Sequence, residues 1–546
     1  MWIVANEAGG GCSPALLIVS LSVMKFRKIL PVSLLALIFG GTFAVGHARA
    51  KPVMVHYMPW FESQPYSDYW GWHWTMNYFN SNITNTNSER EIASWYYPVI
   101  GPYDSADPAV LEYHVLLMKL AGVDGVIVDW YGIDNYNDYA LINQRTADFF
   151  NYTRKAGLKF SLCYEDATIG NEISGGFITA ANATNHAQQA MLYAQTNYFT
   201  DPSYLRLTNM PVLLNFGPQY FKNAAQWVSI FSVLNVTNQP ALFTEDNRLS
   251  VGQGAFDWPP MSLSQTNIIN GEGVLTDYAL QSYLSSFEQK AVAWPAFIST
   301  AFPRFHDIYH QAGVGASYGY RDDENGTNLG ETLTRAMTNA SAIVQIATWN
   351  DFGEGTIVEP TVDGVSGCAL FDTNEPTTEY GYADLGMIQN LRRLYLDAGF
   401  FYHTNDLTLA LRLFNLRELY LYGTTNLYLY GTNQVYNLNV TANPVVSAEL
   451  DRVFSNIVSG NLTVANLQMS GIETGVPVIY NLSITNSQLQ FFIGGYLSQN
   501  GIQIGTSSNL VTWQTVSTLP VSTNQAVFNI SVSPAATPLF FRIQND

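Results

Sequence analysis

Two acidic residues three positions apart close the segment IVQIATWNDFGEGTIVEP, residues 343–360. The segment begins with β-branched and apolar residues, which are typical of a buried strand, and then becomes polar and rich in glycine. Asp351 and Glu354 stand in this polar part, beside Trp349 and Asn350. Two carboxyl groups at the end of a strand can share the work of general acid and general base, as glycosidic cleavage requires. Asp351 and Glu354 are therefore the candidate catalytic residues.

Acidic and aromatic residues also follow most other apolar runs of the chain. Each acid alone is equally well explained as a helix cap or as an acceptor for loop amides. As a group they favour a sugar site, because rings stack on the apolar faces of pyranoses while acids bind hydroxyls. The group comprises His56, Tyr57, Trp60, Asp129, Trp130, Tyr131, Tyr164, Glu165, Asp166, Glu245, Asp246, Asp257 and Trp258.

Eight short apolar runs alternate with helical patterns over residues 51–400. These runs are PVMVHYMPW, GVIVDWYG, KFSLCYED, PVLLNFGP, ALFTED, GAFDWPP, WPAFIST and IVQIATWND. Strands that alternate with helices pair in parallel, so the pattern predicts an α/β fold, a (β/α)8 TIM barrel, whose reacting groups sit at the C-terminal strand ends. An open, doubly wound sheet is the alternative, although no glycine-rich phosphate loop follows a strand.

One helix between these strands is marked by its own end signals. In DPAVLEYHVLLMKLAG, residues 107–122, apolar residues recur at helical spacing. Asp107 can cap the start, Pro108 suits the first turn and Gly122 can end the helix. The segments ALINQRTADFFNYTRKAG and LGETLTRAMTNAS are expected to be helical as well.

The sequence changes character after residue 400. Residues 401–434, which include LTLALRLFNLRELYLYG, are expected to form a linker or a helix that closes the barrel. Residues 435–546 contain short alternating runs, such as QLQFFIGGYL, NGIQIGTSS and QAVFNISV, rich in Asn, Thr, Ser and Val. This pattern predicts a small antiparallel β-sandwich as an accessory domain.

Charge and composition narrow the class of ligand. The chain has 546 residues, a formal charge of -19, 12% charged residues and 14% aromatic residues. So acidic a protein is a poor partner for nucleic acid or anionic membranes. Abundant aromatic residues with few charges suit a neutral ligand rich in hydroxyl groups.

Cysteine and histidine spacing gives no sign of a cofactor. Of three cysteines, Cys163 lies in an apolar strand and is expected to be a buried thiol, although it could pair with Cys368. His56, His73, His114 and His306 are scattered and show no paired metal-ligand spacing. We therefore expect no cofactor and no metal requirement.

The N-terminal region has the order of a secretory signal. Lys25, Arg27 and Lys28 precede an apolar run that ends in small residues around Ala50. Residues 1–50 are thus expected to be a signal peptide and an upstream extension, with Met24 as a possible natural start. Cleavage after Ala50 would release a secreted or periplasmic protein, whereas an uncleaved segment would act as a membrane anchor.

A family resemblance joins these motifs. HYMPW, GWHWTMN, GPYDSADPAVLEYHVLLMKLAGVDGVIVDWYG, LCYED, GAFDW and TWNDFGEGTIVEP follow one another in this order. Together they resemble glycoside hydrolase family 99, the endo-α-mannosidases and endo-α-mannanases, over about residues 52–400. The turn W-N-D-x-G-E is more similar to the related family 71, the α-1,3-glucanases, since family 99 carries W-N-E-x-x-E.

The resemblance implies roles for the two acids. Asp351 would take the proton from the sugar 2-hydroxyl, which then attacks the anomeric carbon to give a 1,2-anhydro sugar. Glu354 would protonate the leaving oxygen and later activate water. A direct base role on water is the alternative for Asp351. The candidate substrate-binding residues are Tyr57, Trp60, His73, Trp130, Tyr131, Glu165, Trp258, Trp349 and Asn350.

The sequence therefore predicts a secreted glycoside hydrolase that cleaves internal α-linkages of a polysaccharide or glycan. An α-1,3-glucanase-like hydrolase is the alternative within this class. Outside it, a non-catalytic carbohydrate-binding protein on a hydrolase barrel and a surface adhesin that works through its β-sandwich remain open.

Overall fold

The structure is a computed structural model that describes residues 51–84, 89–269, 272–362, 381–422, 444–467 and six strands between 478 and 545. The expected signal region, residues 1–50, lies outside the described residues, as do Cys368 and residues 423–434 of the expected linker.

Eight parallel strands form a closed barrel. All eight apolar runs are strands, in the spatial order β3-β2-β1-β13-β10-β7-β6-β5, and β3 also pairs with β5. That last pairing closes the sheet, which confirms the barrel and excludes the open sheet. The barrel strands are β1 (Val53–Tyr57), β2 (Gly125–Trp130), β3 (Lys159–Tyr164), β5 (Met210–Asn215), β6 (Ala241–Glu245), β7 (Gly254–Phe256), β10 (Ile298–Ala301) and β13 (Ile343–Ile346).

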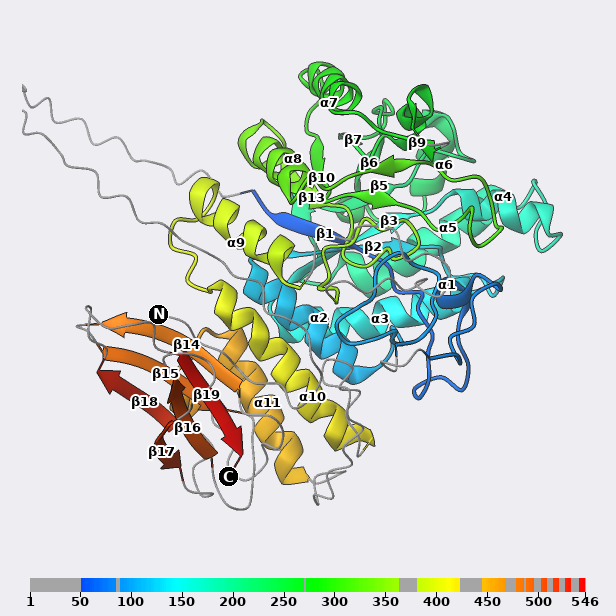
Figure 1. Cartoon of the computed structure of the whole chain (residues 1–546). Helices are drawn as coiled ribbons and strands as arrows, with labels where there is room; N and C mark the ends of the chain where they lie inside the picture. The colour runs from blue at the N-terminus through cyan, green and yellow to red at the C-terminus, as the bar shows by residue number, and fades with distance from the viewer. Residues whose placement is uncertain are drawn as a thin grey trace, which may run out of the picture.

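Helices surround the barrel, and smaller elements decorate its loops (Figure 1). The helices are α1 (Trp72–Thr75), α2 (Pro108–Ala121), α3 (Tyr139–Lys155), α4 (Ala167–Ser174), α5 (Ala183–Ala194), α6 (Ala224–Phe231), α7 (Asp277–Ala291), α8 (Thr327–Thr338) and α9 (Ala383–Tyr395). The short strands are β4 (Arg206–Leu207), β8 (Ile268–Ile269), β9 (Glu272–Gly273), β11 (Phe305–His306) and β12 (Tyr320–Arg321). No helix separates β6 from β7 in this described stretch, so this one unit lacks its crossover helix.

The end signals of α2 work as the sequence predicts. The Asp107 carboxylate accepts a hydrogen bond from the Ala109 amide at 2.8 Å, and Pro108 occupies the first turn. Gly122 ends the helix at φ 85°, a left-handed conformation that favours glycine. A cap of this kind contributes about 1 kcal/mol to stability.

Strand alternation divides the core into two layers. Val126, Val128 and Trp130 of β2 pack outward among the helices, whereas Ile127 packs inside the barrel with Cys163. Successive side chains of a strand point to opposite faces, so Asp129 follows Ile127 to the interior. Cys163 is fully buried, as expected, and burial raises the pKa of its thiol.

Two helices beyond residue 400 belong with the barrel. Helix α10 (Thr408–Tyr422) lies along α2, and α11 (Pro444–Val458) lies beside α10 (Figure 1). Arg417 of α10 forms ion pairs with Glu112 of α2 at 2.8 Å and with Asp451 of α11 at 2.7 Å. Residues 408–422 of the expected linker or barrel-closing segment are therefore helical and packed against α2, while their role in closing the barrel stays a prediction.

Removal of the Arg417 charge is expected to cost stability. Glu112 is 6% exposed, and Arg417→Met would leave this carboxylate buried without its partner. Breaking a buried pair in this way lowers the free energy of unfolding by about 3 kcal/mol or more. Urea denaturation followed by circular dichroism measures the loss, and adding Glu112→Gln should recover part of it. Arg154→Met breaks a more exposed pair with Asp201 and should cost about 1 kcal/mol or less.

The strands of the C-terminal part begin later than expected. Residues 444–467, placed in the β-sandwich by the sequence interpretation, form α11 and α12 (Val464–Leu467) instead. Leu450, Val453, Phe454 and Ile457 recur at helical spacing and are buried, a period that the Asn- and Ser-rich composition obscured.

Six strands form two antiparallel three-stranded sheets at the C-terminus (Figure 1). Their orders are β14-β15-β18 and β17-β16-β19. The strands are β14 (Val478–Thr485), β15 (Gln488–Gly494), β16 (Ile502–Ser507), β17 (Gln514–Leu519), β18 (Ala526–Ser531) and β19 (Phe540–Asn545). The antiparallel strands agree with the expectation, while face-to-face packing as a sandwich stays a prediction. Across the described residues, the helices are all too short or too polar to cross a membrane.

Candidate active site

The loop after β13 is anchored to the end of β1. The Trp349 amide donates a hydrogen bond to the His56 carbonyl at 2.6 Å. The Asn350 side chain accepts from the Met58 amide at 2.8 Å and donates to the Met58 carbonyl at 2.9 Å. It also donates to the Tyr103 hydroxyl at 3.1 Å. These bonds fix the position from which Asp351 projects.

Asp351 and Glu354 share one tight turn. The Asp351 carboxylate accepts from the Glu354 amide at 3.0 Å, and the Glu354 carbonyl accepts from the His306 amide at 2.8 Å. Gly355 closes the turn at φ 69°, and a Cβ there would come within 2.7 Å of the His306 carbonyl. Only glycine fits this position without a shift of backbone, so the turn holds the two acids in a fixed relation.

Burial and mutual repulsion set the protonation of the acid pair. Burial raises the pKa of Asp351 to about 6, although hydrogen bonds from the Glu354 and Gly353 amides oppose the rise. The pKa of Glu354 is raised well above its usual range by burial and then by the charge of Asp351, with further contributions from other acids. Those acids are Asp307, Asp129 and Glu245. This order of pKa values suits Asp351 as the carboxylate and Glu354 as the proton donor.

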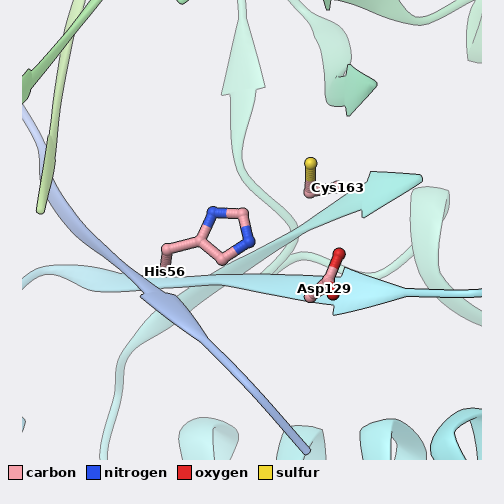
Figure 2. A group of neighbouring side chains, drawn as sticks. All are labelled: His56, Asp129 and Cys163. Carbon is pink, nitrogen blue, oxygen red and sulfur yellow. The ribbon is translucent and has the colours of Figure 1, made fainter. Parts of the chain in front are cut away.

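Three buried side chains form the floor beneath the acids. His56, Asp129 and Cys163 point into one space from β1, β2 and β3, with one ring nitrogen of His56 directed toward the other two (Figure 2). His56 Nδ1 and Asp129 Oδ1 have no hydrogen-bond partner within the described part of the chain. Burial lowers the pKa of His56 to about 3, while burial and Asp351 raise that of Asp129. The floor thus offers a neutral imidazole and a carboxyl group whose charged form is disfavoured by burial.

These floor residues are also able to hold a metal ion by type. One ligand atom from each of His56, Asp129 and Cys163 lies within 4.8 Å of the others. Imidazole, carboxylate and thiolate are all zinc ligands. Sequence spacing carries no signal for this group, because its members come from three separate strands.

Aromatic side chains form one wall of the barrel mouth, the opening at the C-terminal ends of the strands. The Trp60 ring stacks on His73 with 4.3 Å between centroids and lies 6.2 Å from Tyr131. His73 also approaches Asp138 at 3.4 Å. The charges of Asp129 and Glu165, after burial, raise the pKa of Tyr131, which places this wall beside the acids. The Trp258 ring packs edge-on against the His56 ring, with 5.0 Å between centroids.

The predicted Glu165 joins the acid cluster. Its pKa is raised by burial first and then by Asp129, Asp166, Glu245 and Glu354. The structure therefore brings together seven of the eleven predicted site residues, namely Trp60, His73, Tyr131, Glu165, Trp258, Asp351 and Glu354.

The other four predicted site residues do not reach the mouth. Tyr57 bonds to His114 Nδ1 at 3.1 Å and stacks on Phe149. The Trp130 indole donates to Asn143 at 3.0 Å. Both occupy outward positions of their strands, between the barrel and its helices, where strand alternation sends them.

Trp349 and Asn350 are buried as well. Both are 0% exposed, and Trp349 lies edge-on against His114. Their backbone and amide contacts position the acid turn, so they support the site from behind and do not line it.

Several other strand-end acids are structural. Asp166 accepts from the amides of Gln219, Tyr220 and Phe221 at 2.7 to 2.8 Å. Asp257 accepts from the Thr300 amide, and Asp246 accepts from the Tyr283 hydroxyl at 2.5 Å. These three carboxylates therefore support loops and strands by accepting hydrogen bonds from neighbouring groups.

The segment after β10 contributes residues that the sequence interpretation missed. The pKa of Tyr309 is raised by burial and then by Glu354 and Asp351, which places its ring beside the acid pair. Asp307 accepts from Ser317 at 2.9 Å and from the Tyr318 amide at 2.7 Å. The run FPRFHDIYH holds polar and aromatic residues after an apolar strand, which was the available signal.

Comparison with known proteins finds similarity to one family of glycoside hydrolases. The model of glycosyl hydrolase family 99 matches residues 50–234. A glycoprotein endo-alpha-1,2-mannosidase-like protein of Danio rerio is 22% identical over 374 residues, covering 62% of this chain and 77% of the relative. The glycoprotein endo-alpha-1,2-mannosidase of Mus musculus is 29% identical over 288 residues, or 50% of this chain and 58% of the relative.

A solved structure is similar over part of the chain. The GH99 endo-alpha-mannosidase from Bacteroides thetaiotaomicron aligns with a TM-score of 0.47 and 18% identity, covering 63% of this chain and 97% of that one. The family match and the relatives support one conclusion. The chain is a glycoside hydrolase similar to family 99.

Proposed function

We propose that the chain is an endo-acting hydrolase of α-linked, mannose-containing glycans, with Asp351 and Glu354 as its catalytic pair. The observation that carries the proposal is the placement of two acids in one rigid turn, where the Asp351 carboxylate accepts from the Glu354 amide at 3.0 Å. Burial leaves Asp351 with a pKa of about 6, whereas the charge of Asp351 adds to burial at Glu354. Acid pairs whose environments push their pKa values apart are suited to opposite proton-transfer roles.

The proposed reaction uses each acid in the state that its environment favours. Asp351 accepts the proton of the sugar 2-hydroxyl, whose oxygen attacks the anomeric carbon, while Glu354 gives its proton to the leaving oxygen. The glycosidic bond breaks and a 1,2-anhydro sugar forms. Glu354 then takes a proton from water, which opens the anhydro ring as Asp351 returns its proton. The net result is hydrolysis with retention.

The rest of the mouth would bind the chain of sugars. Trp60, with His73 stacked behind it, offers a flat apolar face for a pyranose ring. His56 Nδ1 and Asp129 Oδ1, which lack partners among the described residues, would hydrogen-bond sugar hydroxyls. We also place the enzyme outside the cytoplasm, because Lys25, Arg27 and Lys28 precede an apolar run.

A substrate screen tests the proposal. The purified protein is offered α-mannans, mannose-containing glycans and α-1,3-glucan, and the anomer of each new reducing end is followed by proton NMR. Internal cleavage of a mannose-containing substrate with the α-anomer formed first is the expected result. Cleavage of α-1,3-glucan alone would select the glucanase alternative, and binding without cleavage would identify a non-catalytic sugar-binding protein.

The proposed roles fix the shape of the pH profile. Asp351 must be ionised, so kcat/KM should rise with pH through about 6, the value to which burial raises its pKa. Glu354 must be protonated, so kcat/KM should fall as pH rises through the raised pKa of this group. Asp307→Asn removes one charge that raises the pKa of Glu354, and the alkaline limb should move to lower pH. An acid limb near pH 4, the usual range of an aspartate, would contradict the role of Asp351.

A further inference from the structure

Three potential metal ligands meet beside the active-site loops. Asp134 lies in the loop after β2, Glu172 in α4 and His186 in α5. One ligand atom of each lies within 4.8 Å of the other two. The three residues come from separate elements, and their spacing in the sequence matches no metal-binding motif.

One carboxylate oxygen of this group has no hydrogen-bond partner among the described residues. His186 Nδ1 lies 2.6 Å from Asp134 Oδ2. Glu172 is 1% exposed, faces Asp134, and its Oε2 has no hydrogen-bond partner among the described residues. A buried carboxylate oxygen without a partner is costly, so the group lacks a donor or a cation at this point.

The electrostatics of Asp134 and Glu172 also favour a bound cation. Burial and then the charge of Asp134 raise the pKa of Glu172 to about 7, although His186 opposes the rise. Two facing carboxylates can be neutralised by a proton or by a cation. The side chains of His186 and Asp134 are 22% and 20% exposed, which gives an ion a route from solvent to the buried Glu172.

We propose that Asp134, Glu172 and His186 bind a divalent transition-metal ion, with Zn²⁺ as the first candidate. One imidazole nitrogen and two carboxylates suit zinc and similar ions, whereas Ca²⁺ and Mg²⁺ prefer oxygen ligands throughout. Ligand atoms on tetrahedral zinc stand about 3.3 Å apart, given bonds of about 2.0 to 2.1 Å. His186 and Asp134 would therefore separate by about 0.7 Å from their present 2.6 Å contact.

The position of the site suggests a positioning role. Asp134 follows Tyr131 by three residues, and α4 begins two residues after Glu165. An ion shared by the three ligands would join the loop after β2 to the segment after β3, both of which carry residues of the active-site mouth. This clamp takes no part in proton transfer, and it does not depend on the proposed hydrolysis.

Metal binding by the full chain tests the proposal directly. Protein freed of metal with a chelator is titrated with Zn²⁺ by calorimetry, and thermal unfolding is measured with and without the ion. We expect one equivalent to bind and the Tm to rise. Glu172→Gln and His186→Ala should each weaken binding at least tenfold and abolish the rise in Tm. Circular dichroism checks that both variants fold, and Co²⁺ absorption in the folded variants reports the ligand set independently of stability.

Two controls separate this site from other zinc ligands of the chain. His310→Ala removes an exposed histidine and should bind Zn²⁺ like the wild type. Cys163→Ser removes the thiol of the barrel floor and should also leave the equivalent bound. Loss of the zinc equivalent in Cys163→Ser but not in His186→Ala would overturn the proposal, as would unchanged binding in Glu172→Gln and His186→Ala. Because binding is measured without substrate, failure of the proposed hydrolysis would not produce these results.

Discussion

Glu354→Gln and Asp351→Asn are each expected to lower kcat by about 10²- to 10⁴-fold, the contribution of a positioned acid or base. Each amide keeps the shape of the acid but cannot transfer its proton. The turn should survive, since Asn at 351 can still accept from the Glu354 amide, a bond of 3.0 Å in the wild type. Rates on a substrate that the wild type cleaves give the effect, with circular dichroism as the check on folding.

A substrate with a better leaving group distinguishes the proton donor Glu354 from the base Asp351. An α-glycosyl fluoride needs little help from a proton donor, so Glu354→Gln should recover much of its bond-cleavage rate on that substrate while Asp351→Asn should not. Asp246→Asn is the matched control, because Asp246 also ends a strand but its carboxylate accepts from Tyr283. This variant should keep nearly full activity. Full activity in Glu354→Gln or Asp351→Asn would remove that residue from the mechanism.

Asp351→Glu is expected to lower activity by about 100-fold, although it restores the residue of the family 99 motif. The Asp351 carboxylate is held by the Glu354 and Gly353 amides. A side chain longer by one methylene moves the carboxylate by about 1 Å, and misplacement of that size can cost about 100-fold. The measurement is kcat/KM of both forms on the same α-mannan.

The other outcomes of this substitution are equally informative. Unchanged or higher activity on α-mannan would show that the site accepts the family 99 geometry and that Asp351 does not set the reaction distance. Activity on α-1,3-glucan with none on α-mannan in either form would instead support the glucanase alternative. Thermal unfolding of Asp351→Glu must match the wild type for any of these conclusions.

The strand pattern predicted the barrel, but not which side of it each residue faces. All eight apolar runs are strands, because their β-branched and apolar residues lie in a closed parallel sheet. The interpretation of strand ends selected Tyr57 and Trp130 by residue type. Their neighbours His56 and Asp129 occupy the inward positions instead (Figure 2). Applied strictly, the two-residue period would have separated these pairs.

Other features have no local signal in the sequence. Tyr309 reaches the acid pair because the segment after β10 folds back against the turn, through the bond from the His306 amide to the Glu354 carbonyl. The meeting of Glu172 with His186 depends on how α4 and α5 pack. Such contacts between distant residues follow from tertiary packing and not from periodicity or spacing.

The bonds between the acid turn and the end of β1 make activity a late event in folding. Asn350 holds Met58 across 292 positions of sequence, and β13 lies between β1 and β10. During synthesis from the N-terminus, the ribosome must release nearly the whole barrel before the first and last strands can meet. Contacts of such long range form slowly. A nascent or truncated chain ending before residue 343 would therefore lack hydrolytic activity altogether. The return of activity on refolding would report closure of the barrel.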